Sequence, residues 1–305
     1  MWPTRAAPAL ILCYHRVASG VADPYYLCVS PDHFAQHLKV LTQRLDPVTL
    51  DDLLRPSRRP RVAITFDDGY ADNLLNAVPI ARSLGVPITV YVTSGLIDDR
   101  DGFWWDRLAR LVAHPGEHPV EAEVTIGNET VHVPLGVPEQ VNSTIHELQA
   151  KLKPRSLEEI THVLDQLADA VGAMPPAAAD RPLTTDELGQ LADEPGVTIG
   201  GHTVVHTLLR GTSRSHQEEA IGRSKHDLET RLKRPVRHFA YPFGGTDSFD
   251  ETSVEVIRDF GFATATTTLA GSVRATSDPL QLHRRLVMNW NHSRFLVQLV
   301  RWGFL

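Results

Sequence analysis

Short apolar runs alternate with longer amphipathic segments through most of the sequence. Ala9–Tyr14 is an uninterrupted apolar run and Pro87–Val92 is rich in β-branched and aromatic residues, so both predict buried strands. Between them, Phe34, Leu38 and Leu41 recur at the spacing of one helix face. The same reasoning predicts further strands at 62–64, 197–200, 236–241, 263–267 and 286–288, and helices at 71–85, 215–232, 250–260 and across 295–302.

Alternating strands and helices predict an α/β fold whose parallel sheet is either open or closed as a barrel. One segment, 98–190, breaks this rhythm. It contains a short polar-apolar alternation near 120–133, a helical stretch over 138–171 and a Pro-Ala-rich end at 175–182. We therefore expect a single domain over residues 1–305, with 98–190 as a mostly helical insertion within it.

Composition narrows the classes of function. The chain has 305 residues, 42% of them hydrophobic, which allows a large core. A net charge of −7 without a basic run gives no support to nucleic-acid binding. Two cysteines without a Cys-x-x-Cys pair favour a reducing compartment. No run is long enough to span a membrane, and the apolar run at 9–14 is too short for a signal peptide, so we expect a cytoplasmic protein.

Two adjacent carboxylates, Asp67 and Asp68, stand where a predicted strand opens into a turn. The strand Val62-Ala63-Ile64 leads into Thr65-Phe66-Asp67-Asp68-Gly69-Tyr70, and a helical pattern begins directly afterwards. Burying two carboxylates side by side is costly unless a cation or a shared proton relieves them. The alternative is an ordinary turn and helix cap, for which Asp and Gly are common choices.

A second cluster of polar residues follows the strand that ends at Ile199. His202 and His206 are four residues apart, which on a helical turn places them on one side, where they can share a metal ion. Among fifteen histidines such pairs also arise by chance. Together with the Asp67-Asp68 pair, however, the two imidazoles complete the open ligand set of a hydrolytic zinc-type site.

These two motifs, in this order, resemble those of the polysaccharide deacetylase family, the carbohydrate esterases with NodB homology. A third segment, Phe239-Ala240-Tyr241-Pro242-Phe243-Gly244, is more loosely similar to the third motif of that family. The resemblance covers most of the chain apart from roughly 98–190. It implies a distorted (β/α) barrel with fewer than eight strands.

The resemblance also implies roles for individual residues. Asp67 would be the general base, while Asp68, His202 and His206 would hold one divalent metal, with zinc expected and cobalt, nickel or iron as alternatives. The turn that contains Tyr241 and Phe243 would contact the substrate and present a backbone N–H, that of Phe243, to the developing oxyanion.

Two positions depart from the family pattern. The arginine that orients the base in many members is replaced by Ala240, and Arg237, Arg284 and Arg285 are the candidate substitutes. The late Leu-x-His motif that supplies the general acid is matched only superficially by Leu282-His283. Tyr14-His15-Arg16-Val17 resembles the opening of a subgroup in which this motif is moved to the front, so we prefer His15 to His283 as the acid.

The sequence thus predicts a metal-dependent deacetylase that removes an N-acyl group, foremost acetyl, from an amino sugar or a sugar-containing intermediate. The alternatives are a deformylase or amidohydrolase acting on a small non-sugar amide, and a carbohydrate-binding protein that has lost activity on the same scaffold. Trp104, Trp105 and Trp290 are candidates for stacking on sugar faces, although large aromatic residues more often belong to the core.

Overall fold

Seven parallel strands form a closed ring in the computed structural model, which describes residues 7–21, 23–55, 57–113, 120–172 and 180–305. The ring is closed because β1 pairs with both β5 and β12. A two-residue strand, β4 (Asp46–Pro47), adds to the outside of β5. In ring order, the strands are β1 (Ala9–Tyr14), β12 (Leu282–Leu286), β11 (Thr264–Ala270), β10 (His238–Ala240), β9 (Val197–Gly201), β6 (Ile88–Val92) and β5 (Arg61–Phe66). The prediction of a barrel with fewer than eight strands is confirmed.

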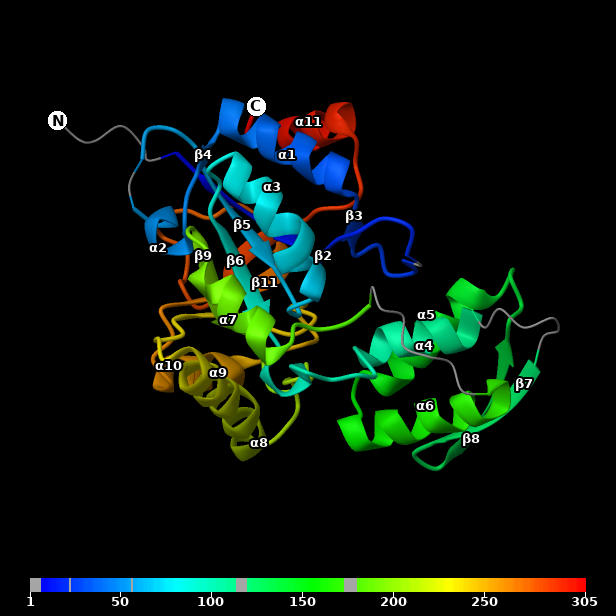
Figure 1. Cartoon of the computed structure of the whole chain (residues 1–305). Coiled ribbons are helices and arrows are strands. Elements are labelled where there is room, and N and C mark those ends of the chain that lie inside the picture. Colours follow the sequence, from blue (N-terminus) through cyan, green and yellow to red (C-terminus); the bar gives the residue numbers. More distant parts are fainter. Residues whose placement is uncertain (1–6, 22, 56, 114–119, 173–179) are drawn as a thin grey trace. The chain divides into compact units, whose positions relative to one another are not determined.

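Helices cover the outside of this ring (Figure 1). Their N-termini follow local sequence signals: Ser30 caps α1 through the His33 N–H, and Thr184 with Glu187 forms a capping box on α7. The helices of the barrel unit are α1 (Pro31–Arg44), α2 (Leu50–Leu53), η1 with α3 (Asn73–Ala77, Val78–Ser83), η2 (Ser94–Leu96), α7 (Thr185–Asp193), α8, η3 and α9 (Arg214–Glu218, Glu219–Arg223, Ser224–Leu232), α10 (Glu251–Asp259) and α11 (His292–Arg301).

Side chains along each strand alternate between the barrel interior and the helical layer, because successive residues of a strand point to opposite faces. Leu12 and Tyr14 belong to the large apolar cluster shared with α1 and α11. Ile11, Ala63 and Leu282 belong to a smaller cluster gathered from several strands of the ring. Polar residues at the carboxyl end of this inner layer are therefore held at fixed positions by the strands beneath them.

The chain divides into two compact units. The barrel unit contains the described residues of Met1–Ser19, Tyr26–Ile97 and Leu183–Leu305, and the second unit those of Gly20–Tyr25 and Asp98–Pro182. The second unit consists of α4 (Trp104–Ala113), α5 (Val141–Leu152), α6 (Leu157–Val171) and the antiparallel hairpin of β7 (Val120–Ile126) and β8 (Glu129–Leu135). Residues 183–190, which the sequence reading grouped with the insertion, lie in the barrel unit. Part of the predicted Pro-Ala segment, 175–179, lies outside the described residues.

Several predicted boundaries differ from the structure. The last strand lies at Leu282–Leu286 rather than at 286–288, because it carries a buried arginine where an apolar run was expected. The helices predicted at 71–85 and 215–232 each contain a five-residue π-helical turn. The stretch 138–171 forms two helices, and a connection around Pro154 separates them.

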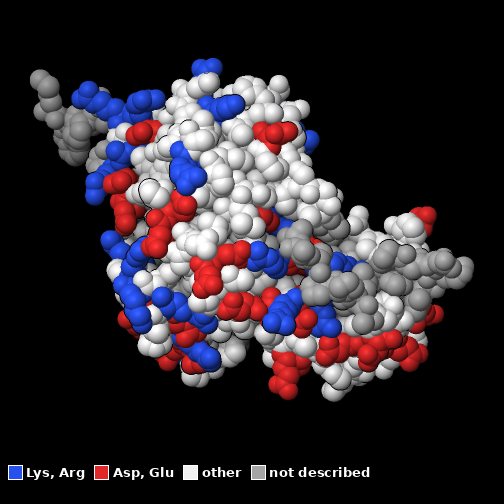
Figure 2. Space-filling model, viewed as in Figure 1, with Lys and Arg blue, Asp and Glu red and all other residues white. Residues whose placement is uncertain are grey.

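The short β2 (Arg16–Val17) continues from β1 and pairs with β3 (Cys28–Val29). On the surface, Lys and Arg side chains are interspersed with Asp and Glu on the face shown in Figure 2. Arg214, for example, pairs with Glu218, Glu255 and Asp259. None of the helices in the described ranges is long and apolar enough to cross a membrane.

Candidate active site

The two aspartates lie in a tight turn at the carboxyl end of β5. The Asp67 N–H donates to the Tyr14 carbonyl oxygen at 3.0 Å, so the turn remains attached to β1. Asp68 and Gly69 both have positive φ, 75° and 90°. Gly69 packs so closely on Val92 that a Cβ would lie 3.1 Å from its Cγ1 atom. This strained backbone separates the two carboxylates and gives each a different set of partners.

Asp68, His202 and His206 form one buried cluster. The Nε2 atoms of both histidines lie 3.5 Å from Asp68 Oδ1, and one candidate ligand atom from each residue lies within 4.8 Å of the others. The side chain of Asp68 is 3% exposed, that of His202 1% and that of His206 8%. One oxygen and two imidazole nitrogens converging on one point fit a zinc-type divalent ion and leave further coordination positions open.

The two histidines lie on an irregular turn and not on a helix, which corrects the expectation from their spacing. Thr203 and His206 have φ values of 63° and 57°, so the backbone reverses between the two imidazoles. The turn is held against the loop after β6, because Ser94 and Gly95 donate their N–H groups to the carbonyl oxygens of Thr203 and Val204 at 3.1 and 2.7 Å. The convergence of the imidazoles therefore depends on two neighbouring loops.

Hydrogen bonding and burial prepare these groups to bind a cation. The Nδ1 atom of His202 lies 2.8 Å from the Ala240 carbonyl oxygen, which assigns the proton to Nδ1 and leaves Nε2 as the ligand atom. Burial lowers the pKa of His206 to about 3, so its imidazole stays neutral. For Asp68, burial raises the pKa, but the surrounding imidazoles of His202, His206 and His15 outweigh this and leave the pKa below its ordinary value.

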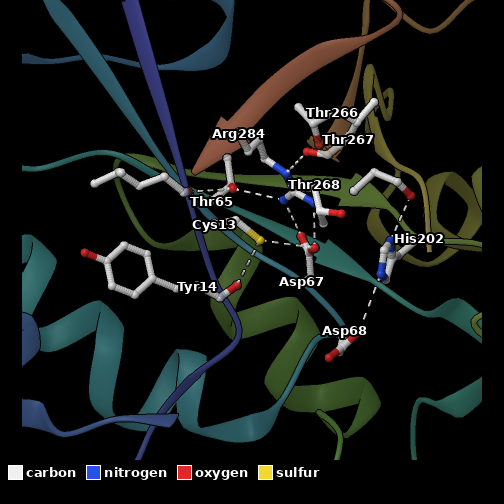
Figure 3. A network of polar contacts seen from close by, with 12 residues as sticks. Cys13, Tyr14, Thr65, Asp67, Asp68, His202, Thr266, Thr267, Thr268 and Arg284 are labelled. Carbon is white, nitrogen blue, oxygen red and sulfur yellow. Dashed lines mark hydrogen bonds and ion pairs between the residues drawn. The ribbon is translucent and has the colours of Figure 1, made fainter. Parts of the chain in front are cut away.

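Asp67 has a different partner, Arg284 of β12. Arg284 donates from Nη1 to Asp67 Oδ1 at 2.6 Å and from Nη2 to Oδ2 at 2.7 Å (Figure 3). Its remaining donors reach Thr65 Oγ1 and the Thr267 carbonyl oxygen, and the guanidinium lies 5.6 Å from the centre of the Tyr91 ring. Burial raises the pKa of Asp67, but the charge and hydrogen bonds of Arg284 more than offset this and leave the pKa below its usual range.

Of the three candidate arginines, Arg284 is thus the one that contacts Asp67. Arg237 is largely exposed and pairs with Asp51 at 3.4 Å. Arg285 points to the other side of β12, where its guanidinium lies 5.6 Å from the centre of the Trp302 ring. The alternation along β12 explains the difference, since Arg284 shares the inward face with Leu282.

His15 lies beside the aspartates at the end of β1. A ring nitrogen of His15, the Cys13 thiol and an Asp67 oxygen all lie within 4.8 Å of one another. His283 is exposed, on the opposite face of β12 from Arg284, and packs against the backbone at Gly271. Of the two histidines considered as the general acid, the structure places only His15 near Asp67.

Cys13 was not singled out from the sequence. Its Sγ atom donates to Asp67 Oδ2 at 3.5 Å, and burial raises the pKa of its thiol well above the ordinary value. Cys13 is therefore a neutral neighbour of the base. Its place on the inward face follows from the same alternation that directs His15 there, a signal present in the sequence.

The two residues of the third motif lie in different environments. Tyr241 is fully buried, its N–H donates to the Thr266 carbonyl oxygen, and its hydroxyl donates to the Leu280 carbonyl oxygen, so it belongs to the core. Phe243 has a φ of 61°, and its ring packs edge-on against His206 with centroids 4.5 Å apart. The prediction of an oxyanion contact therefore rests on Phe243 alone.

The three tryptophans considered for sugar stacking are buried. Trp104 and Trp105 are 5% and 4% exposed within the second unit, and Trp290 is 8% exposed in the barrel unit. They serve as core residues in this structure.

Comparison with known proteins places this geometry in a family. A model of the polysaccharide deacetylase family matches residues 55–265. The chain belongs to the polysaccharide deacetylase family. The matched residues include Asp67, Asp68, His202 and His206. His15 and Arg284 lie outside the match, so their place beside Asp67 is a finding of the structure.

Individual relatives of the chain agree with this family assignment. It is 30% identical over 111 residues to "Putative polysaccharide deacetylase YxkH" of Bacillus subtilis (strain 168), a match that covers 34% of this chain and only 38% of that relative. Streptococcus pyogenes deacetylase PplD, solved in complex with acetate, matches with a TM-score of 0.62 and 19% identity over 96% of this chain and 98% of that one. IcaB from Ammonifex degensii matches with a TM-score of 0.65 and 17% identity, over 99% of this chain and 99% of that one. These likenesses show a shared NodB-like barrel fold.

Proposed function

We propose that the protein is a metal-dependent hydrolase that removes an N-acyl group, foremost acetyl, from an amino sugar or a sugar-containing intermediate. One observation carries the proposal: an Asp-His-His cluster suited to a metal lies directly beside a second, ionised aspartate and a histidine. Family membership supports the acetylated sugar as substrate class.

Asp68, His202 and His206 would hold the ion, and we propose zinc because two neutral imidazoles and a carboxylate suit it. When bound there, a zinc ion supplies Lewis acidity toward the acyl carbonyl and lowers the pKa of a water molecule.

The remaining steps belong to the chain's own side chains and backbone. Asp67 accepts the proton of the attacking water, and Arg284 keeps its carboxylate ionised and correctly oriented. The backbone N–H of Phe243 donates to the oxygen of the tetrahedral intermediate. His15 donates a proton to the leaving amine, a role that an imidazole beside the base can fill.

Metal content and substrate release test the proposal together. Purified protein should contain one divalent ion per chain and should release acetate from N-acetylated amino sugars. His206→Ala should lose both properties. His216→Ala, which changes an exposed histidine of α8, should keep both. Equal metal content in the wild type and His206→Ala would exclude the assigned ligands. Hydrolysis of formylated sugars or ureides alone would favour a deformylase or amidohydrolase. Sugar binding without turnover would favour a carbohydrate-binding protein that has lost activity.

The choice of general acid is tested separately. His15→Ala should lower turnover by roughly two orders of magnitude, the usual contribution of a proton donor, with metal content unchanged. His283→Ala should have little effect, because its ring lies on the outer face of β12. The reverse ranking in a steady-state assay would transfer the role to His283.

A further inference from the structure

The segment that carries His15 is attached at several points to the start of the helix after the aspartates. Asp72 Oδ2 accepts from Arg16 Nε at 3.0 Å, and Asp72 Oδ1 accepts from the Val17 N–H at 3.0 Å. Asn73 Nδ2 donates to the His15 carbonyl oxygen at 2.8 Å. The backbone at His15 and directly after it is thus held by two consecutive residues, Asp72 and Asn73.

These contacts are buried, which makes them costly. The Arg16 side chain is 2% exposed and that of Asp72 is 8% exposed, and the guanidinium also lies 4.5 Å from the centre of the Tyr70 ring. A buried ion pair loses so much hydration that it contributes little net stability. A charged pair at this place therefore needs an explanation other than stability, and the geometry of the segment it holds offers one.

The attachment joins the two segments that supply the proposed proton donor and acceptor. Asp72 and Asn73 lie four to six residues after Asp67 and Asp68 on the same stretch of chain, whereas His15 comes from the end of β1. A rigid link between these segments fixes the distance from His15 to the aspartates independently of the substrate. Small displacements of a catalytic group lower the rate strongly.

We propose that Asp72 is a positioning residue that holds His15 in place for proton donation to the leaving amine, an inference that rests on the proposed function. Asp72→Asn keeps an oxygen that can accept from Val17 but removes the charge beside Arg16. Asp72→Ala removes both interactions and should have the larger effect. Arg214→Gln, at a surface ion-pair cluster of the same unit, is the matched control.

The leaving group distinguishes positioning from general damage. An amide releases an amine that needs a proton, whereas an activated aryl acetate releases a phenolate that does not. In Asp72→Ala, kcat for the N-acetyl amino sugar should fall by about tenfold or more, while the aryl ester changes much less. His15→Ala should lower the amide-to-ester ratio in the same way, and Arg214→Gln should leave it unchanged. An equal fall for both substrates in Asp72→Ala would overturn the positioning role.

Amide hydrogen exchange tests the anchor without any turnover. The N–H groups of Arg16 and Ala18 donate to the carbonyl oxygens of Leu27 and Val29, which the substitution does not touch. If Asp72 holds this segment, both amides should exchange at least several-fold faster in Asp72→Ala, with amides of β6 unchanged. Unchanged exchange would refute the anchor even in an active enzyme. Absence of turnover by the wild type on both substrates would instead contradict the proposed function.

Discussion

Asp67 and Asp68 are chemically identical neighbours, yet their surroundings give them different tasks. Asp68 faces two imidazoles at 3.5 Å, whereas Asp67 is held by both terminal nitrogens of Arg284. The positive φ of Asp68 turns the backbone between them, so neither carboxylate lies in the other's set of partners. Two carboxyl groups in contrasting environments are a common basis for divided roles in catalysis.

Replacing Arg284 should separate orientation of the base from metal binding. Arg284→Met leaves Asp67 buried without its counter-charge, so we expect a loss of roughly 3 kcal/mol in the free energy of unfolding and of about 100-fold in turnover. Metal content should be retained, because the hydrogen bonds of Arg284 in the described part of the chain go to Thr65, Asp67 and Thr267 and not to the three metal ligands.

Arg285→Met is the matched control, since its side chain lies on the opposite face of the same strand. It should keep turnover close to that of the wild type. Urea unfolding, metal analysis and steady-state kinetics on both variants provide the comparison. Equal activity of the two variants would show that Arg284 does not orient the base.

How far the sequence predicts the site depends on how local each signal is. The positions of Asp67, Asp68, His202 and His206 follow from short motifs at strand ends. Arg284 was one of three candidates, because nothing within its own segment shows that it faces a carboxylate 217 residues earlier. Asp72 carried no sequence signal at all, since an aspartate near the start of a helix is ordinary.

At the level of elements, the loops do more than the helices to shape the site. Sequence spacing predicted a helical turn for His202 and His206, but the fold supplies an irregular turn held by the loop after β6. This difference has a physical reason: backbone bonds from Ser94 and Gly95 fix the turn, and residue types in 202–206 do not reveal bonds to another loop. Similarly, β12 was misplaced because an inward-facing charge interrupts its apolar pattern.

Gly95 provides a test of this loop contact. A Cβ at this position would lie 2.6 Å from Val204 Cγ1 and 2.8 Å from the Val204 carbonyl oxygen, so Gly95→Ala must push the His202–His206 turn away. We expect weaker metal binding, by about tenfold or more, since displaced supports of metal ligands typically have this effect.

Gly189→Ala serves as the control, because nothing lies within 4 Å of a Cβ there and the residue is inside α7. Its helix should gain about 0.5–1 kcal/mol in stability, and metal affinity should not change. Titration with a chelator reports both affinities. Identical metal affinity in the two variants would argue against the loop contact as a support of the site.

For the molecule as a whole, the sequence predicts most of the ring well because those strands are short buried runs, and that information is local; β12, with its inward-facing charge, is the exception. The sequence predicted the long-range pairings of polar groups poorly. His37 is one example: it is fully buried between Tyr14 and Trp290, with Nδ1 3.2 Å from the Tyr14 hydroxyl and Nε2 2.7 Å from the Trp290 carbonyl oxygen. The cytoplasmic location expected from composition stays a prediction.

His37 should make stability depend on pH. Burial lowers its pKa to about 4, against about 6.5 in the unfolded chain, although the hydrogen bond to Trp290 opposes the shift. Below pH 6.5 the unfolded chain therefore binds more protons, and the free energy of unfolding falls as the pH is lowered toward 4. This group alone should account for about 2 kcal/mol between pH 7 and pH 5.

Urea unfolding of His37→Phe over this pH range measures the contribution. The variant should be less stable than the wild type at pH 7, because Tyr14 and Trp290 lose a partner, but its stability should depend less steeply on pH. His226→Gln, at an exposed position of α9, should keep the wild-type slope. An unchanged slope in His37→Phe would show that His37 is not the responsible group.

Closure of the ring by β12 has a consequence for the order of events during synthesis. Asp67 leaves the ribosome 217 residues before Arg284, and the two meet only when β12 inserts between β1 and β11. Contacts so distant in the sequence form slowly, because the intervening chain must first be ordered. A nascent chain that has completed β5, β6 and the turn after β9 already contains all three candidate metal ligands but lacks the cation that orients the base. The capacity to bind metal is therefore expected to arise before the capacity for catalysis.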